Sequence, residues 1–246
     1  MRKIVALGAT SLIAQETLKN FAKDKDSFFL IGRNEEKLNE VAKNLEVLGA
    51  SEVNVKVVKD VCDFKAHQEI INEADKMLSN FDNFFVFYGV LGNQKEMEED
   101  FSKAKELLDV NFISVASFVS IVANKFEKEK RGNIAVISSV AGDRGRQSNY
   151  FYGASKGGLS VFLEGLRNRL SFSNVNVLTV KPGFVATPMT AHREKGLLFA
   201  SADYVGKTIY KAVKKNKNVL YTPCFWWGIM FIVKHIPECI FKKMKM

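Results

Sequence analysis

Residues 4–14 read IVALGATSLIA, and this stretch decides the fold. A short apolar run at residues 4–7 leads directly into Gly8 and other small residues, and a helical pattern extends from residue 11 to about 23. Short apolar runs are typical of buried parallel strands, and small residues at the strand end let the backbone turn tightly into a helix. The stretch therefore predicts the first strand, turn and helix of an α/β domain. A signal peptide is the alternative, because Arg2 and Lys3 precede the apolar run, but the small residues interrupt it.

The same pattern repeats along the chain. Apolar runs occur at residues 28–31, 53–58, 84–86, 134–137 and 175–180. Helical segments separate them, including residues 34–48, an apolar stripe that begins at Leu108, and residues 152–170. Strands that alternate with helices predict a doubly wound parallel sheet. Without an internal repeat or a linker, the sequence predicts one domain at residues 1–222 and a separate tail at residues 223–246.

Composition and cysteine content limit the class of protein. The 246 residues are 47% hydrophobic and 26% charged, as in a folded protein. The three cysteines form no C-x-x-C pair, and their odd number argues against a disulfide framework, so we expect a reducing, cytoplasmic setting. The three histidines (His67, His192 and His235) are scattered and predict no metal site.

Positive charge is concentrated in the last quarter of the chain. Residues 1–180 contain 24 Lys and Arg against 24 Asp and Glu, whereas residues 181–246 contain 12 against 3, which accounts for the net charge of +9. No recognition helix or aromatic-basic platform accompanies this charge, so nucleic-acid binding is not expected. An anionic membrane surface or an anionic substrate fits better.

The tail combines apolar and basic residues. Residues 224–233 read CFWWGIMFIV, about half the length that crosses a bilayer, and Lys234, Pro237, Lys242, Lys243 and Lys245 follow. Tryptophans beside an apolar run and a lysine cluster predict an interfacial segment, peripheral at the inner face of the membrane. The alternatives are that the tail covers the substrate cleft or packs against another subunit.

The first turn predicts a dinucleotide pyrophosphate site. Small residues let the backbone approach a phosphate, and helix N-terminal N–H groups hold its charge. The candidate contacts are Gly8, Thr10, Ser11, Leu12 and Ile13. Leu12 and Ala14 stand where glycines are usual, so a plain strand-to-helix turn is the alternative.

The ends of the next two predicted strands supply further candidates. Arg33 follows the second strand, where an acidic residue suits NAD and an arginine suits the 2′-phosphate of NADP. Arg33 therefore favours NADP(H), although NAD(H) and a solvated surface arginine stay open. Asp60 and Val61 follow the third strand and are candidates for the adenine, unless Asp60 caps a helix beginning near Phe64.

Residues 138–156 contain the predicted catalytic group. Tyr152 and Lys156 are spaced i and i+4 and therefore lie on one face of a helix. A lysine ammonium favours a nearby phenolate, so we expect the pKa of Tyr152 to be lowered toward working pH. Such a tyrosine can donate a proton to a carbonyl oxygen. Ser139 ends the preceding strand and can hydrogen-bond the same oxygen.

With Asn111 in the sequence VNF, these residues resemble the Asn-Ser-Tyr-Lys tetrad of the short-chain dehydrogenase/reductase family. The resemblance spans about residues 3–190 and implies a Rossmann-type fold, with Asn111 holding a water in a proton relay. The segment KPGFVAT at residues 181–187 resembles the family's nicotinamide contact, which implies roles for Pro182, Gly183, Val185 and Thr187; Gly89 joins the cofactor set. A packing amide at Asn111 and a helix cap at Thr187 are the alternatives. The resemblance also implies a homodimer or homotetramer through the helices that begin near Leu108 and Tyr152.

Other stretches depart from the common family pattern and resemble one branch. The usual Asn-Asn-Ala-Gly reads VFYG at residues 86–89, so the cofactor floor must be stabilised differently. Residues 88–94, 142–150 and 235–241 resemble the decaprenylphosphoryl-2-keto-pentose reductases. That likeness implies a lipid-linked keto-sugar substrate in envelope polysaccharide synthesis and a partner oxidase. Arg144 and Arg146 are then candidates for the substrate phosphate, or else charged residues of a solvated loop.

The sequence thus predicts an NADPH-dependent ketone reductase. Reduction of another hydrophobic ketone, such as an acyl or steroid-like compound, is the alternative within the same chemistry. A non-catalytic nucleotide-binding membrane adaptor is the alternative from another class, and the intact tetrad argues against it.

Overall fold

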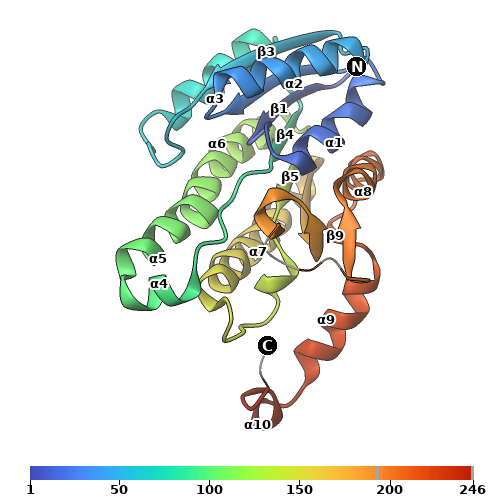
Figure 1. Ribbon diagram of the computed structural model, residues 1–246. Coiled ribbons are helices and arrows are strands. Elements are labelled where there is room, and N and C mark those ends of the chain that lie inside the picture. Colours follow the sequence, from blue (N-terminus) through green and yellow to red (C-terminus); the bar gives the residue numbers. More distant parts are fainter. Residues whose placement is uncertain (192–193, 195, 245–246) are drawn as a thin grey trace.

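One parallel sheet runs through the computed structural model, which describes residues 1–191, 194 and 196–244 (Figure 1). Its strand order is β3-β2-β1-β4-β5-β6-β9, and every neighbouring pair is parallel. The strands are β1 (Lys3–Leu7), β2 (Ser27–Gly32), β3 (Glu52–Val57), β4 (Asn83–Val86), β5 (Gly132–Ile137), β6 (Val175–Pro182) and β9 (Val219–Thr222). Short strands β7 (Phe184–Ala186) and β8 (Phe199–Ser201) pair beside the sheet. The predicted doubly wound α/β fold is confirmed.

Helices cover both faces of the sheet. One face packs against α1 (Leu12–Ala22), α2 (Glu35–Val47) and α8 (Ala202–Lys214), and the other against α3 (His67–Met77), α6 (Ser114–Glu129) and α7 (Tyr150–Leu170). Side chains alternate between the faces, so Ile4 and Ala6 join the first cluster while Val5 and Leu7 join the second. Because both faces of the central strands are buried, β2 and β4 and most of β1 and β5 are apolar runs, and these runs located the central strands, whereas the edge strand β3 reads EVNVKV.

Three boundaries differ from the expectations. The third crossover helix begins at His67, not near Phe64, and Asp60 accepts a hydrogen bond from the backbone N–H of Cys62 inside a turn. The stripe that begins at Leu108 belongs to a helical run that starts earlier, with α4 (Gln94–Glu99) before α5 (Phe101–Leu108) and the π-helical turn η1 (Asp109–Ile113) before α6. Strand β9 was not among the predicted apolar runs and forms the last element before residue 223, where the tail was predicted to begin.

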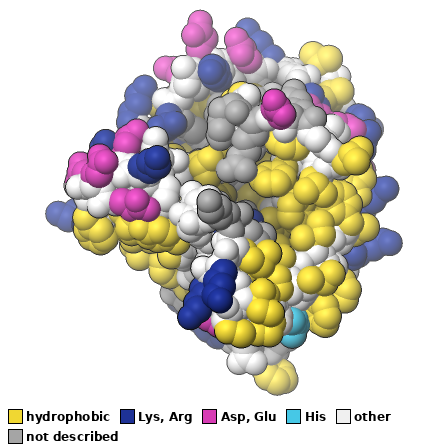
Figure 2. Space-filling view, turned by 60° about the horizontal axis from the view of Figure 1, so that its bottom comes forward, with side chains coloured by type: hydrophobic (Ala, Val, Ile, Leu, Met, Phe, Trp, Pro, Cys, Tyr) yellow, Lys and Arg dark blue, Asp and Glu magenta, His cyan; other side chains and the backbone are white. Residues whose placement is uncertain are grey.

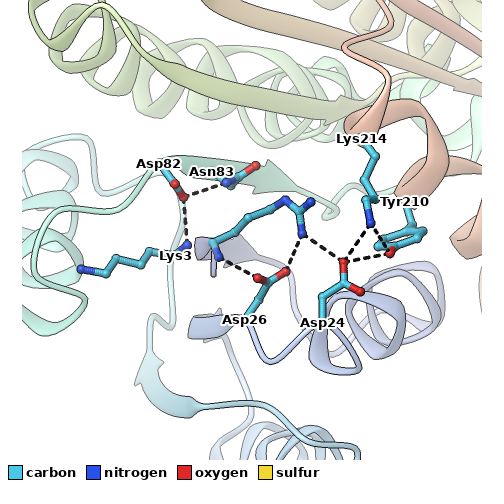
Figure 3. A network of polar contacts seen from close by, with 8 residues as sticks. Lys3, Asp24, Asp26, Asp82, Asn83, Tyr210 and Lys214 are labelled. Atoms are coloured by element: carbon cyan, nitrogen blue, oxygen red, sulfur yellow. Dashed lines mark hydrogen bonds and ion pairs between the residues drawn. The ribbon is translucent and has the colours of Figure 1, made fainter.

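A polar network closes the amino ends of the strands (Figure 3). The Arg2 guanidinium contacts Asp26 at 3.0 Å and Asp24 at 3.1 Å, and Asp24 also accepts from Tyr210 and Lys214 at 2.8 and 3.2 Å. Burial raises the pKa of Asp26 despite its hydrogen bonds from Arg2. The network ties β1 and β2 to α8, at the end of the sheet away from the carboxyl ends of the strands.

The tail folds as a helix against the body. Helix α9 (Phe225–His235) follows β9, and the four-residue α10 (Glu238–Phe241) follows α9 at the lower end of the molecule (Figure 1). Trp226, Met230 and Val233 of α9 pack with Val140 in a small buried cluster. Of the described helices, the run Phe101–Glu129 is long and apolar enough to cross a membrane by length and composition, and its inner face is part of the core.

Candidate active site

A pocket opens where β4, β5 and β6 end, as expected for an open parallel sheet. Six elements meet there, so residues distant in sequence share one wall. Of the predicted site residues, the lining includes Gly89, Ser139, Arg146, Tyr152, Lys156, Pro182, Gly183, Val185 and Thr187. Its remaining lining is mostly apolar and includes Phe87, Leu91, Val140, Phe184 and Met189.

Glycines bring the catalytic helix close to the loop that follows β5. A Cβ at Gly142 would lie 2.6 Å from the backbone nitrogen of Gly157, and a Cβ at Gly153 would lie 3.0 Å from the carbonyl oxygen of Ala141. Helix α7 therefore packs directly on this loop, and its first turns place Tyr152 and Lys156 in the pocket. The i, i+4 spacing does put both residues at one site.

Two adjacent serines have different roles. The Ser138 hydroxyl is buried and bonds the Lys156 carbonyl at 3.0 Å and the Ser160 hydroxyl at 2.8 Å, so it fastens β5 to α7. Ser139 lines the pocket, and its Oγ accepts from the backbone N–H of Ala141 at 3.1 Å. Because that contact uses a lone pair, the Ser139 O–H proton remains able to donate to a ligand oxygen.

The ionisable pair has the electrostatics of a buried site. Burial raises the pKa of Tyr152, and a hydrogen bond with Ser139 acts in the opposite direction. Burial lowers the pKa of Lys156 to about 8, while its Nζ donates to the Ile137 carbonyl at 3.0 Å. The expectation that Lys156 lowers the pKa of Tyr152 is wrong for the chain without ligands, because desolvation dominates. The phenol keeps its proton at neutral pH, as a proton donor requires.

Asn111 lies in the π-helical turn η1 and is completely buried. Its Oδ1 accepts from the backbone N–H of Val90 at 2.8 Å, and its Nδ2 donates to the Val90 carbonyl at 2.7 Å and faces Ser155 Oγ at 3.3 Å. The side chain therefore holds the loop after β4 against α7. Such π turns are frequent at functional sites.

Replacing Gly89 with alanine is expected to lower activity about tenfold while the fold persists. A Cβ at Gly89 would lie 3.0 Å from Asn111 Oδ1 and 3.3 Å from Lys156 Nζ, so these groups must move by tenths of an ångström, and small misplacements are costly in catalysis. The measurement is kcat/KM beside a thermal melt. Gly145→Ala is the control, because no heavy atom lies within 4 Å of that added Cβ. Equal effects of both variants would contradict the packing argument.

The turn after β1 fits a dinucleotide phosphate. Gly8 has φ of +74°, and a Cβ there would lie 2.7 Å from the backbone nitrogen of Tyr88, so only glycine suits the position. Ser11 caps α1 by accepting from the Ala14 N–H at 3.1 Å. The N–H groups of Leu12 and Ile13 in the first turn have no intrahelical acceptor and are free for an anion. Thr10 precedes the cap in the same turn. The two missing glycines do not prevent the turn.

The floor beside this turn differs from the common pattern. The Tyr88 hydroxyl bonds the Ser114 hydroxyl at 2.7 Å, and Ser114 donates to the Val110 carbonyl at 2.8 Å. Burial raises the pKa of Tyr88, so its phenol stays neutral. These two hydrogen bonds link the segment after β4 to α6 and stabilise the cofactor floor in place of the usual asparagines.

Arg33, Asp60 and Val61, the candidates for the adenosine end of the cofactor, follow the neighbouring strands β2 and β3. Arg33 is exposed after β2, and Lys59 Nζ donates to its carbonyl at 3.3 Å, so two cations lie at this corner. Sequence reasoning missed Lys59, although its place beside Asp60 was a signal. The buried His67 ring bonds the Val61 carbonyl at 2.9 Å and fixes the loop, and burial lowers the pKa of His67.

Helix α9 supports the wall of the pocket that is formed by the segment after β6. A Cβ at Gly183 would lie 1.8 Å from Nε1 of Trp226, so the indole edge rests on the Gly183 backbone. Trp226 also packs edge-on against Phe184, with ring centroids 5.4 Å apart. Thr187 lines the pocket and its carbonyl accepts from the Thr190 hydroxyl at 3.1 Å. This contact agrees with the alternative that the tail covers the substrate cleft.

The two candidate arginines point in different directions. Arg144 donates to the carbonyls of Val233 and Ile236, both at 2.6 Å, pairs with Glu238 at 2.9 Å and stacks on Phe241 at 3.7 Å. It therefore fastens the end of α9 and does not line the pocket. Arg146 does line the pocket, with its Nη2 3.2 Å from the sulfur of Met230.

No group of three metal-ligating side chains occurs among the described residues, and His192 lies outside them. The segment at residues 187–202 borders the pocket through Thr187, Met189 and Thr190, and its residues 192, 193 and 195 lie outside the described part of the chain.

Comparisons with known proteins agree with this geometry. The profile of the family described as short chain dehydrogenase matches residues 2–197. An uncharacterized oxidoreductase of Mycobacterium tuberculosis is 28% identical over 244 residues, with 98% of this chain and 96% of that protein covered. An 11-beta-hydroxysteroid dehydrogenase-like protein of Arabidopsis thaliana is 26% identical over 96% of this chain and 78% of its own length. A short-chain dehydrogenase from Sphingobium yanoikuyae, solved in complex with NADPH, superimposes with a TM-score of 0.81 at 18% identity over 97% of both chains.

Proposed function

Since the chain belongs to the short-chain dehydrogenase/reductase family and is an NAD(P)-dependent oxidoreductase, we propose that it reduces the ketone of an apolar substrate with NADPH. The observation that carries the proposal is the pocket that brings Ser139, Tyr152 and Lys156 together, with Tyr152 hydrogen-bonded to Ser139. A phenol at this place can donate its proton to a carbonyl oxygen as hydride reaches the carbonyl carbon.

Each tetrad residue then has a distinct task. Ser139 donates its O–H to the substrate oxygen and stabilises the charge that develops there. Tyr152 transfers its phenolic proton to the same oxygen, and the Lys156 ammonium stabilises the resulting phenolate and returns a proton to it. Asn111 fixes the Gly89–Val90 backbone against Lys156 and holds the water of the relay. The cofactor, when bound, supplies the hydride to the carbonyl carbon.

We propose that the pyrophosphate is held by the turn after β1, through Gly8, Thr10, Ser11, Leu12 and Ile13. Asp60 and Val61 contact the adenine, and the segment Pro182 to Thr187 contacts the nicotinamide. The positive φ of Gly8 and the open first turn of α1 support the first assignment. The short-chain dehydrogenase from Sphingobium yanoikuyae binds NADPH, and Arg33 with Lys59 supports the same preference here.

Replacing Arg33 with alanine is expected to raise KM for NADPH about tenfold or more while KM for NADH stays nearly constant. Arg33 would lose a charge-assisted contact with the 2′-phosphate, which NADH lacks. Steady-state kinetics with both cofactors measure the difference. Lys43→Ala removes an exposed charge from α2 and is the control. Equal loss with NADH and NADPH would contradict the assignment of Arg33.

We further propose that the substrate is a lipid-linked keto-sugar of the polyprenyl-phosphate type, and that a partner oxidase supplies it. The apolar lining around Leu91, Phe184 and Met189 suits a lipid-bearing ketone, and Arg146 is the cation that suits its phosphate. Arg144 is bound to the tail and is less suited to this role. A steroid-like or acyl ketone is the second candidate, favoured by the name of the Arabidopsis thaliana relative.

The test measures NADPH oxidation with a polyprenyl-phosphate 2-keto-pentose in detergent and, separately, with a neutral steroid ketone. We expect turnover of the first, with KM raised about tenfold by Arg146→Ala. Turnover of the neutral ketone alone would replace the first substrate by the second. A folded protein that binds NADPH and reduces neither would contradict both.

The assembly follows the family resemblance. We propose that residues 1–222 form the catalytic domain and residues 223–246 an interfacial segment at the inner face of the membrane. We also propose a homodimer or homotetramer through α6 and α7. Size-exclusion chromatography with light scattering tests the second point.

A further inference from the structure

The outer side of α9 has an unusual composition for a surface helix. The first nine of its eleven residues are apolar, but of these Trp226, Met230 and Val233 are buried against the body and Ile229 packs partly buried beside them. Phe225, Trp227, Phe231 and Ile232 are 42%, 61%, 53% and 66% exposed. A helix that is apolar on every side is normally covered on every side. The outer half of α9 therefore lacks a cover within the chain.

The apolar surface extends beyond α9 toward the pocket. Leu197 is fully exposed and Leu198 is 43% exposed just before β8, and Ile240 of α10 is 55% exposed. Figure 2 shows hydrophobic side chains gathered on this face, between the grey segment and the histidine near the lower edge. Met189 is 41% exposed and also lines the pocket, so the surface reaches the pocket mouth.

From these positions we infer that this docking face, made of the outer side of α9, Leu197, Leu198 and Ile240, lies on an anionic lipid bilayer and turns the pocket mouth toward it. The inference deepens the interfacial role proposed above for residues 223–246, and it rests on the proposed function for its biological purpose, the capture of a lipid-bearing ketone. The physical case for the docking face is independent of the substrate.

The charges around the docking face favour an anionic lipid surface as its binding partner. Lys234, Lys242 and Lys243 are exposed at the end of α9 and beyond it. Glu238 is the one acidic residue among residues 223–244, and Arg144 binds it at 2.9 Å. The part of the rim formed by residues 223–244 is therefore positive, and lysines beside interfacial tryptophans fit acidic lipid headgroups. A second copy on the same face would bring two sets of these lysines together, which costs free energy.

The docking face is held rigidly relative to the active site. Trp226 rests on Gly183, and Arg144 joins the loop before α7 to the carbonyl groups at the end of α9. The Arg144 guanidinium also stacks on Phe241 of α10 at 3.7 Å. The tail is thus no flexible anchor, and adsorption of α9 fixes the orientation of the pocket above the lipid.

Vesicle co-sedimentation of the full chain tests the inference. The probes are vesicles of phosphatidylcholine alone and of phosphatidylcholine mixed with phosphatidylglycerol. The variants are Trp227→Ser with Phe231→Ser, and Lys242→Glu with Lys243→Glu. Phe172→Ser is the control, because Phe172 is 98% exposed on the short turn after α7, outside the docking face.

We expect the wild-type chain to sediment with the anionic vesicles. The aromatic pair variant should lose about tenfold or more in binding, the charge variant should lose its preference for the anionic vesicles, and the control should bind as the wild type does. Absence of wild-type binding, or equal loss in the control, would overturn the inference. A dimer that the aromatic variant dissociates, without vesicle binding, would identify a second copy as the occupant instead. NADPH binding, measured by fluorescence on each variant, verifies folding, and ketone turnover in detergent tests the proposed function separately.

Discussion

Replacing Tyr152 with phenylalanine is expected to lower kcat/KM for ketone reduction about a thousandfold and to leave NADPH binding nearly unchanged. The substitution removes one oxygen, which is the proton donor, and keeps the ring that fills the pocket wall. General acid catalysis contributes about 10² to 10⁴ in rate, which sets the size of the loss. NADPH oxidation measures turnover, and titration of cofactor fluorescence measures binding.

Tyr150→Phe is the matched control for this variant. Tyr150 begins the same helix two residues earlier, but it is 41% exposed and does not line the pocket. The control should retain almost full activity. If Tyr152→Phe keeps more than about a tenth of the wild-type rate, then Tyr152 is not the acid. A wild-type protein that binds NADPH yet reduces no ketone would favour the non-catalytic adaptor instead.

The sequence allowed the architecture to be predicted because parallel strands are buried on both faces. Runs such as residues 28–31 and 134–137 stand out from the amphipathic helices between them, and β2 and β5 were found there. Strand β9 was missed because it is four residues long and directly precedes the apolar tail. Local spacing also sufficed to place Tyr152 and Lys156 together, since i and i+4 share a helix face.

Contacts between distant segments were beyond prediction from local pattern. The indole of Trp226 rests on Gly183, 43 positions earlier, and Arg144 binds carbonyl groups about 90 positions later. Neither contact has a periodic or compositional signal, so the sequence left Arg144 as either a candidate for the substrate phosphate or a charged residue of a solvated loop. The prediction that the pKa of Tyr152 is lowered was wrong for a related reason. The sequence shows the neighbouring charge of Lys156 but not the burial of the phenol, which outweighs that charge.

Replacing Lys156 with methionine is expected to stabilise the fold while it abolishes most activity. Burial lowers the pKa of Lys156 from 10.5 to about 8, so at neutral pH the folded chain carries a desolvated ammonium. A shift of this size corresponds to a cost on the order of 3 kcal/mol, which methionine, of similar volume, does not have. Activity should fall by about 10² or more, because the phenolate of Tyr152 loses its stabilising charge.

The lowered pKa of Lys156 also predicts how the stability difference between the wild type and Lys156→Met changes with pH. Between about pH 8 and pH 10.5 the unfolded chain binds more protons at Lys156 than the folded chain, so the stability of the wild type rises with pH relative to the variant. The difference in melting temperature should therefore be largest below pH 8, in favour of Lys156→Met, and should shrink toward pH 10. Thermal melts from pH 7 to pH 10 measure it, with exposed Lys43→Met as the control. A difference that is constant with pH would mean that packing, and not the buried charge, sets the stability at this position. Activity and stability then oppose each other at one residue, as expected where a fold holds a costly charge for the sake of its chemistry.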